Sequence, residues 1–171
     1  MKTIGYMAMS VNGMIATGTE ETPWSDTIWR VYVDTVAEFG NIVVGRRTYE
    51  FMRDGGDFDS FKTQPETVVI TAGEHGVLSA HSRKKSPAEA LKHLEDKGFE
   101  RVLVGGGAQT ITSFLREGRL DELWLDVEPV LIGGGINLLS EELQIRLSFT
   151  DTISLGGGVI RLRYAVAGEQ S

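Results

Sequence analysis

The sequence predicts an α/β fold in which a largely parallel sheet ends in an antiparallel hairpin. Along the first two thirds of the chain, short runs rich in Val, Ile and Leu alternate with amphipathic stretches. This alternation is typical of strand–helix–strand crossover units, which build parallel sheets. In the last third, two strand-like runs follow one another with no helical pattern between them. They indicate an antiparallel pair that closes one edge of the sheet.

The expected strands are short apolar runs bounded by Gly, Asp or Asn. They cover residues 3–9, 41–45, 67–71, 102–104 and 120–127. The expected helices lie between them, at residues 26–39, 46–53, 87–97 and 108–117. The last two helices end before glycines, as helices often do. The polar stretch 53–66 is expected to form an exposed loop.

The composition favours one soluble domain. With 171 residues and 41% hydrophobic content, the chain can bury one sizeable core. A formal net charge of −7 and a pI near 5.0 argue against nucleic-acid binding. The absence of cysteine excludes thiolate metal sites and thiol nucleophiles. Because there is neither a signal-peptide pattern nor a long apolar run, we expect a cytoplasmic protein that does not bind membranes.

Three glycine triplets stand out among the 21 glycines. The first, Gly105 to Gly107 in "VLVGGGAQTITSFL", lies between a strand and a helix, where the backbone can approach a phosphate closely. The alternative for this triplet is tight packing of the strand against the helix. The second, Gly133 to Gly135, is either a plain loop or part of a pocket wall. The third, in "LGGG" at 155–158, is expected to turn the hairpin between the strand-like runs 144–154 and 159–167.

Two arginines open the helix in "NIVVGRRTYEFM", residues 41–52. Arg46 and Arg47 follow Gly45 at the helix N-terminus, where a cation opposes the helix dipole unless an anion binds there. The helix amides, both guanidinium groups and the Thr48 hydroxyl could donate to a phosphate. The alternative is that both arginines point into solvent.

Asp26 is the candidate acid. At helical spacing it lies on the same side as Trp29, Val33 and Ala37, so it is expected to head an apolar stripe. Desolvation there would favour the protonated carboxyl, which could then serve as a proton donor. The alternative is a first-turn acid favoured by the helix dipole.

The histidines and tryptophans do not indicate a further functional site. The three histidines, His75, His81 and His93, lack the spacing of a metal site, so no metal is expected. The tryptophans Trp24, Trp29 and Trp124 are expected in the core or in a pocket wall.

Taken together, these motifs suggest a family. The segments "MAMSVNGMIA", "TPWSD", "VVGRRTYEFM" and "VLVGGGAQTITSFL" occur in this order over nearly the whole chain, and the set resembles the dihydrofolate reductase superfamily. The segments "SVNGMIA" and "GRLDELWLDVEPVLIGGGINLL" are similar to the riboflavin-biosynthesis reductase domain, which is the C-terminal half of a bifunctional deaminase-reductase.

The resemblance implies a three-layer dihydrofolate reductase-like fold, with a mixed, mostly parallel central sheet and helices on both faces. It implies an NADPH-dependent oxidoreductase acting on a pyrimidine- or pteridine-type substrate, either riboflavin-precursor-like or pterin-like, and a homodimer. The predicted substrate residues are Asn12, Trp24 and Asp26, and the expected proton donor is Asp26 or a water molecule that it orders. Folate reductases carry their acid further beyond the Pro-Trp pair than Asp26 stands beyond Pro23 and Trp24. The cofactor residues carried over are Ala8, Ile15, Gly45, Arg46, Arg47, Thr48, Thr71, Gly105, Gly106, Gly107, Ala108 and Gln109.

One departure from the family pattern concerns the substrate. Folate reductases place an arginine before the third strand, whereas here no Lys or Arg lies between Lys62 and Arg83. A folate is therefore disfavoured, although a true dihydrofolate reductase remains an alternative. The sequence is also compatible with a non-catalytic NADP-binding sensor or subunit, and with a purely structural domain.

Overall fold

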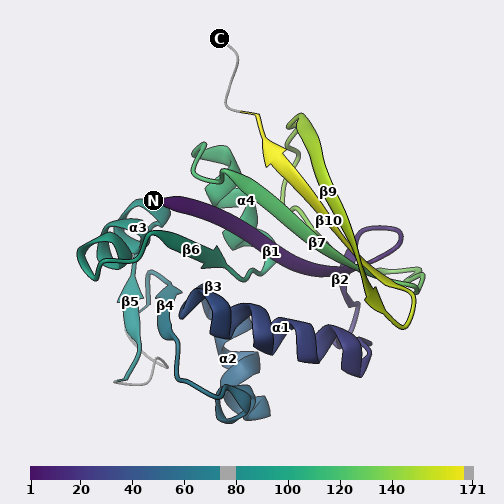
Figure 1. Cartoon of the computed structure of the whole chain (residues 1–171), viewed down its shortest axis with the longest axis horizontal. Helices are drawn as coiled ribbons and strands as arrows, with labels where there is room; N and C mark the ends of the chain where they lie inside the picture. The colour runs from purple at the N-terminus through teal and green to yellow at the C-terminus, as the bar shows by residue number, and fades with distance from the viewer. Residues whose placement is uncertain (74–79, 168–171) are drawn as a thin grey trace.

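The computed structural model describes residues 1–73 and 80–167, and within them an eight-stranded sheet forms the centre of the molecule (Figure 1). The strands are arranged in the order β5-β4-β3-β6-β1-β7-β10-β9. Every neighbouring pair from β5 to β7 is parallel, whereas β10 runs antiparallel to both β7 and β9. The predicted mixed, mostly parallel sheet with a C-terminal hairpin is thus confirmed.

The strands of this sheet are β1 (Lys2–Ser10), β3 (Asn41–Gly45), β4 (Glu66–Ile70), β5 (Ser82–Lys84), β6 (Arg101–Val104), β7 (Glu122–Glu128), β9 (Leu147–Gly156) and β10 (Val159–Val166). The helices are α1 (Asp26–Phe39), α2 (Arg46–Gly55), α3 (Pro87–Asp96) and α4 (Ala108–Arg116), with a short 3-10 helix, η1 (Asp57–Ser60). Two small strands, β2 (Met14–Thr17) and β8 (Gly135–Asn137), pair with each other apart from the main sheet.

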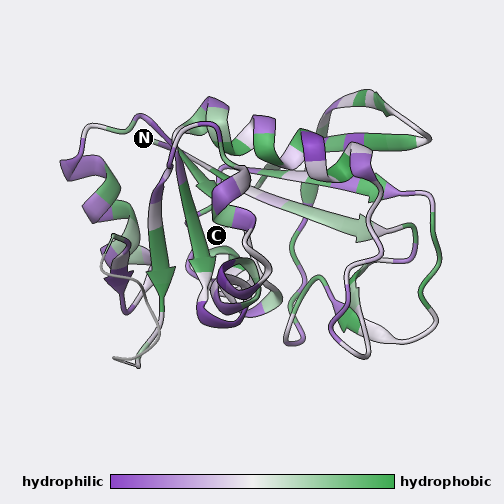
Figure 2. Ribbon diagram, turned by 90° about the horizontal axis from the view of Figure 1, so that it is seen from below, coloured by the Kyte–Doolittle hydropathy of each residue, from purple (hydrophilic) through white to green (hydrophobic). Residues whose placement is uncertain are grey.

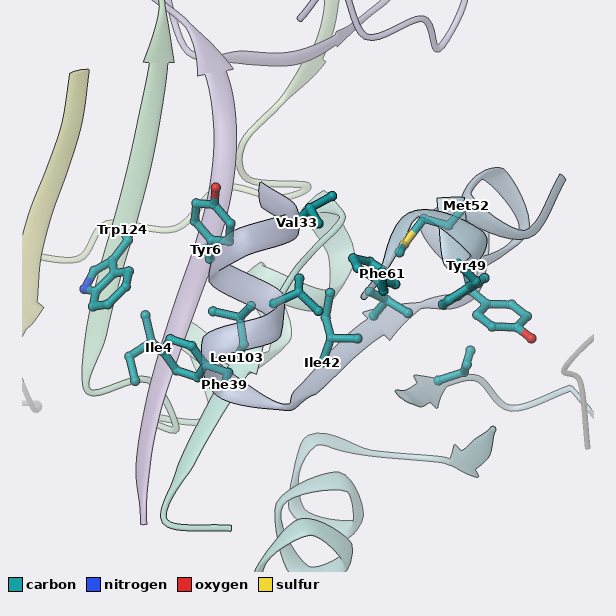
Figure 3. Close-up of a cluster of buried hydrophobic side chains, with 14 residues drawn as sticks. Ile4, Tyr6, Val33, Phe39, Ile42, Tyr49, Met52, Phe61, Leu103 and Trp124 are labelled. Carbon is teal, nitrogen blue, oxygen red and sulfur yellow. The ribbon is translucent and has the colours of Figure 1, made fainter. Parts of the chain in front are cut away.

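Alternate residues of the strands face two separate apolar clusters, and these define three layers. Ile42 and Val44 of β3 contribute to the cluster beneath α1 and α2, whereas Val43 between them contributes to the cluster beneath α3 and α4. Figure 3 shows the first cluster, with Val33 of α1 and Met52 of α2 over the sheet. Figure 2 shows apolar strands between helices that carry hydrophilic segments. The predicted helices on both faces are confirmed.

Most element boundaries agree with the sequence prediction. Helix α1 and strand β3 have the predicted bounds. Helix α1 ends because Gly40 adopts a left-handed conformation with φ of 66°. Strand β9 begins three residues later than predicted and extends to Gly156. No helix among the described residues is long and apolar enough to cross a membrane.

The prediction of an exposed loop at 53–66 was wrong. Helix α2 continues to Gly55, and η1 follows it at once. Phe58 and Phe61 are buried in the cluster beneath α1 and α2. Two phenylalanines three residues apart were a sign of burial that the surrounding polar residues obscured.

The third glycine triplet turns the hairpin, as predicted. Gly156, Gly157 and Gly158 have φ values of 93°, 62° and 81°, which side chains disfavour. The chain thereby reverses between β9 and β10, which lie at the opposite edge of the sheet from β5 (Figure 1).

Candidate active site

A large cleft of about 1240 Å³ opens at the carboxyl ends of the parallel strands. Its walls include residues from the C-terminal half of β1 and residues that end or follow β3, β4 and β6, together with residues of α1 and α2. Ligands of open α/β sheets bind at this edge, because the strand ends and the helix N-termini converge there. The cleft has two ends of different construction, which we call the glycine end and the aromatic end.

The glycine end is made of Gly45, Thr48, Gly105, Gly107 and Gln109, which surround the first turns of α2 and α4. Helix α2 follows Gly45 and helix α4 follows Gly107, and no side chain of the described residues caps either start. The first amides of both helices are therefore free of side-chain caps on the cleft side. Such convergent amides suit the oxygens of a phosphate.

Close packing explains why three glycines are needed here. A Cβ on Gly105 would lie 2.7 Å from Ile42 Cδ1, and a Cβ on Gly107 would lie 3.0 Å from Thr48 Oγ1. Gly106 is buried with φ of 96°, and a Cβ there would overlap the sulfur of Met7. The tight packing that the sequence left open as an alternative is therefore present, and the backbone of Gly105 and Gly107 still faces the cleft.

Gly106 takes a different position from its neighbours. It does not line the cleft, and its carbonyl accepts a hydrogen bond of 2.8 Å from the Gly45 amide. This bond ties the end of β3 to the start of α4. Of the predicted triplet, Gly105 and Gly107 face the cleft and Gly106 supports them. The second triplet does not line the cleft either, although Ile136, directly after it, does.

Arginines and a lysine lie beside the glycine end. Arg46 donates to Glu50 at 2.8 Å and Arg47 donates to Glu20 at 2.7 Å, and both guanidinium groups remain largely exposed. A Cβ on Gly73 would lie 3.5 Å from Arg46 Nη1 and 3.6 Å from Thr71 Oγ1, so Arg46 and Thr71 meet around Gly73.

Lys85 also lines the cleft. Lys85 was not predicted as a site residue because β5, which precedes it, has only three residues and no apolar pattern.

The end of β1 and the segment after it are placed partly as expected. Ala8 and Ile15 line the cleft, whereas Asn12 does not. The Asn12 amide exchanges two hydrogen bonds with the backbone of Ile132, at 2.8 and 3.1 Å, and its oxygen accepts from Ser10 at 2.8 Å. The polar atoms of Asn12 thus hold the loop in place, and its placement at the substrate stays a prediction.

The aromatic end lies between α1 and α2. Trp24, Trp29 and Phe51 line it, and Trp29 and Phe51 keep 38% and 53% of their surface exposed. Behind them, Tyr32 stacks on Trp29 with ring centroids 5.6 Å apart and on Tyr6 at 6.0 Å. Trp24 and Trp29 are thus pocket-wall residues, while Trp124 is buried in the core. A row of rings that ends in exposed faces suits a flat aromatic ligand.

The expected burial of Asp26 was wrong. Asp26 lines the cleft but is exposed, and Trp29 is partly exposed as well. The buried side of α1 carries Val33 of the expected stripe together with Ile28, Val36 and Phe39. The apolar stripe is therefore confirmed at Val33, whereas Asp26 and Trp29 in the first turn face the cleft.

Asp57 of η1 is a second carboxyl group at the aromatic end. It is half-buried, and this burial raises the pKa of its carboxyl group. Burial, together with the charge of Asp57, raises the pKa of Tyr32 well above its usual range. The Tyr32 phenol therefore stays protonated, and its hydroxyl lies 3.6 Å from the sulfur of Met52.

A buried charged group supports the floor of the aromatic end. The Tyr6 hydroxyl donates to Asp126 at 2.6 Å, and Arg161 of β10 donates to the same carboxylate at 2.7 and 2.8 Å. Burial and the charge of Asp126 raise the pKa of Tyr6, so its hydroxyl remains a donor. Arg161 also donates to Thr35 of α1 at 3.2 Å. The C-terminal hairpin is thereby joined to the ring that forms the floor.

The described histidines have partners away from the cleft. His81 forms a 2.9 Å hydrogen bond with Tyr49, and His93 forms a 2.8 Å hydrogen bond with Glu66. His75 lies outside the described residues. No group of three potential metal ligands occurs within residues 1–73 and 80–167.

The fold is dihydrofolate reductase-like. Dihydrofolate reductase from Enterococcus faecalis superimposes with a TM-score of 0.74 over 96% of both chains, at 14% identity. The chain belongs to the RibD C-terminal domain family, whose model matches residues 2–160.

Two further similarities fit this family. The uncharacterized protein YwjB of Bacillus subtilis is 29% identical over an alignment of 180 positions. The alignment covers 97% of this chain and 98% of YwjB. A Thermotoga maritima protein described as a diaminohydroxyphosphoribosylaminopyrimidine deaminase/5-amino-6-(5-phosphoribosylamino)uracil reductase has a TM-score of 0.76 at 13% identity. The match covers 97% of this chain and 56% of that protein.

Proposed function

We propose that this protein is a reductase that takes hydride from NADPH and transfers it to a small heterocyclic substrate of the pyrimidine or pterin kind. The observation that carries the proposal is one continuous cleft with uncapped helix starts and cations at one end and exposed aromatic rings at the other. The similarities support it, because the T. maritima protein is described as a uracil reductase and the E. faecalis enzyme is described in complex with NADP(H).

In this proposal the glycine end holds the phosphates of NADPH. The amides after Gly45 and Gly107, with the Thr48 hydroxyl, would donate to the pyrophosphate. A Cβ at Gly105 or Gly107 would contact neighbouring side chains, so this phosphate site depends on glycine at both positions. Ala108 and Gln109 of the first turn of α4 lie beside it.

The three cations would bind the 2′-phosphate that distinguishes NADPH from NADH. Arg46 Nη1 and Thr71 Oγ1 both lie close to Gly73. Lys85 lines the cleft directly after Lys84, whose carbonyl accepts a 2.9 Å hydrogen bond from the Thr71 amide. Arg47 adds a second guanidinium group at the start of α2. Charge-assisted hydrogen bonds from these groups are stronger than neutral ones.

At the junction of the two ends, Ala8 and Ile15 would border the nicotinamide, which supplies the hydride when NADPH is bound. Trp24 would contact the substrate on the other side. Asp26 would deliver the proton, directly or through a water molecule that it orders. Because Asp26 is exposed in the cleft, a water molecule can reach its carboxylate and carry the proton to the substrate.

The experiment that tests the proposal is a titration of the protein with NADPH and with NADH, followed by quenching of Trp24 and Trp29. We expect micromolar NADPH binding and much weaker NADH binding. Arg46→Ala should weaken NADPH binding by about tenfold, the value of one charge-assisted hydrogen bond. The control Arg116→Ala removes an exposed arginine outside the cleft and should change nothing. Failure to bind either nucleotide would contradict the proposal.

We also propose that the protein forms a homodimer through the C-terminal hairpin. Leu147 and Phe149 of β9 are exposed, and the Phe149 ring packs edge-on against Tyr164 with centroids 5.9 Å apart. Apolar groups of this kind on an edge strand are usually covered. Light scattering should give twice the chain mass, and Phe149→Asp should reduce it to one chain.

A further inference from the structure

The charges of the cleft are divided between its two ends. The cations that line it are Arg46 and Arg47, which begin α2 directly after Gly45, and Lys85, which follows β5; Arg47 is paired with Glu20, which also lines the cleft. The residues that line the aromatic end are Trp24, Asp26, Ile28, Trp29, Tyr32, Phe51, Met52 and Asp57, and none of them is basic. A ligand that occupies the aromatic end therefore meets rings and carboxyl groups.

This division determines which ligands the aromatic end can accept. A phosphate group is bound by Arg, Lys or convergent amides. Helix α1 does begin near this end, but its first turn carries Asp26, whose charge opposes a second anion. The carboxyl group of Asp57 forms no ion pair with any described residue, so nothing nearby compensates its charge. A phosphate at this end would be repelled.

The same groups favour a flat ring with a positive charge. Trp29 presents one face of a stacked row that continues through Tyr32 to Tyr6. Aromatic faces attract cations electrostatically, and more strongly where water is excluded. Asp26 stands on α1 and Asp57 on η1, so carboxyl groups approach the ring row from two different elements.

We propose that the substrate of this protein is a flat aromatic compound without a phosphate group, and that a positively charged ring is preferred to a neutral one. This inference rests on the proposed function, because it names the substrate class of the same cleft. It also separates the chain from the T. maritima protein, whose described uracil substrate is phosphoribosylated. The two proteins would share the fold and differ in the substrate end.

Three naphthalene derivatives of similar size and different charge test the proposal. They are 2-naphthamidine, which is a cation, 2-naphthamide, which is neutral, and 2-naphthyl phosphate, which is an anion. Binding is measured by calorimetry on protein saturated with NADPH, so that the glycine end is occupied. We expect the amidine to bind at least about tenfold more tightly than the amide, as one charge-assisted hydrogen bond allows, and the phosphate to bind most weakly.

Matched variants test whether the preference for the amidine arises from the carboxyl groups of the cleft. Asp57→Asn and Asp26→Asn should each reduce the preference for the amidine over the amide. Asp59→Asn removes an exposed carboxyl group of the same short helix that does not line the cleft, so the preference should stay unchanged. Because all three changes remove one carboxylate, a general effect of net charge would appear equally in all of them.

The proposal is overturned if the naphthyl phosphate binds as tightly as the amide, or if the amide equals the amidine. A failure of the proposed function is recognised separately, because NADPH would then not bind in the preceding titration. In that case the same three compounds are compared on the free protein in the presence of excess inorganic phosphate. The order of affinities decides the substrate class in either case.

Discussion

The two ends of the cleft are built by different parts of the chain. At the glycine end, backbone atoms of two strand-to-helix junctions come together, and the absence of side chains creates the space. At the aromatic end, side chains from α1, α2 and η1 meet over a ring held by a buried ion pair. The glycine end therefore depends on residues without side chains, whereas the aromatic end depends on contacts between residues that are distant in the sequence. The two ends should therefore respond differently to substitution.

The largest expected effect comes from breaking the support of the aromatic end. Arg161 and Asp126 are buried, with side-chain exposures of 6% and 0%. Arg161→Met leaves a buried carboxylate without its partner, so we expect a loss of about 3–5 kcal/mol in the free energy of unfolding, measured in urea. Arg116→Met, which breaks an exposed ion pair with Glu141, should stay within about 0.5 kcal/mol. Equal losses in both variants would show that the buried pair does not support the floor.

A smaller effect is expected from filling the glycine end. Gly105→Ala places a Cβ against the buried Ile42, and such overpacking costs about 1–3 kcal/mol. NADPH binding should weaken as the junction shifts, while binding of a naphthamidine probe at the aromatic end should persist. Gly133→Ala is the control, because no atom lies within 4 Å of a Cβ there. If both probes weakened together, the two ends would not be separate units.

The smallest expected effect concerns Asp57 and pH. Its pKa is raised by burial in the folded protein, so the folded state binds this proton more tightly than the unfolded state. Stability is therefore lost as pH rises through the folded pKa. Asp57→Asn removes this loss and should raise the free energy of unfolding at pH 7 by about 0.5 kcal/mol, since the group is partly solvated. The gain should vanish in acid, below the ordinary pKa of aspartate. A gain that is constant with pH would exclude this cause.

The fold could be predicted from the sequence because its signals are local. Alternating apolar runs and glycine stops gave the bounds of α1 and β3, and the hairpin glycines required positive φ. Strands β2, β5 and β8 have three or four residues each and no apolar alternation, so the sequence contained no signal for them. Their positions are decided by pairing with distant segments.

The site could be predicted only in part, for the same reason. The glycine end follows from two local motifs around Gly45 and Gly105, and both face the cleft. The aromatic end could not be predicted in this way, since Asp57 reaches it only when η1 folds over Phe58 and Phe61. Tyr6 and Arg161, near opposite ends of the chain, both donate hydrogen bonds to the carboxylate of Asp126. No short motif records such a contact.

We propose that one cleft holds NADPH and a flat aromatic compound side by side. Magnetic resonance can test it directly, through interligand Overhauser effects in a mixture of protein, NADPH and 2-naphthamidine. We expect effects between the nicotinamide protons and the naphthalene protons, because Ala8 and Ile15, which would border the nicotinamide, line the same cleft as the aromatic end. Displacement of one compound by the other, with no interligand effect, would contradict simultaneous binding of both compounds in the cleft.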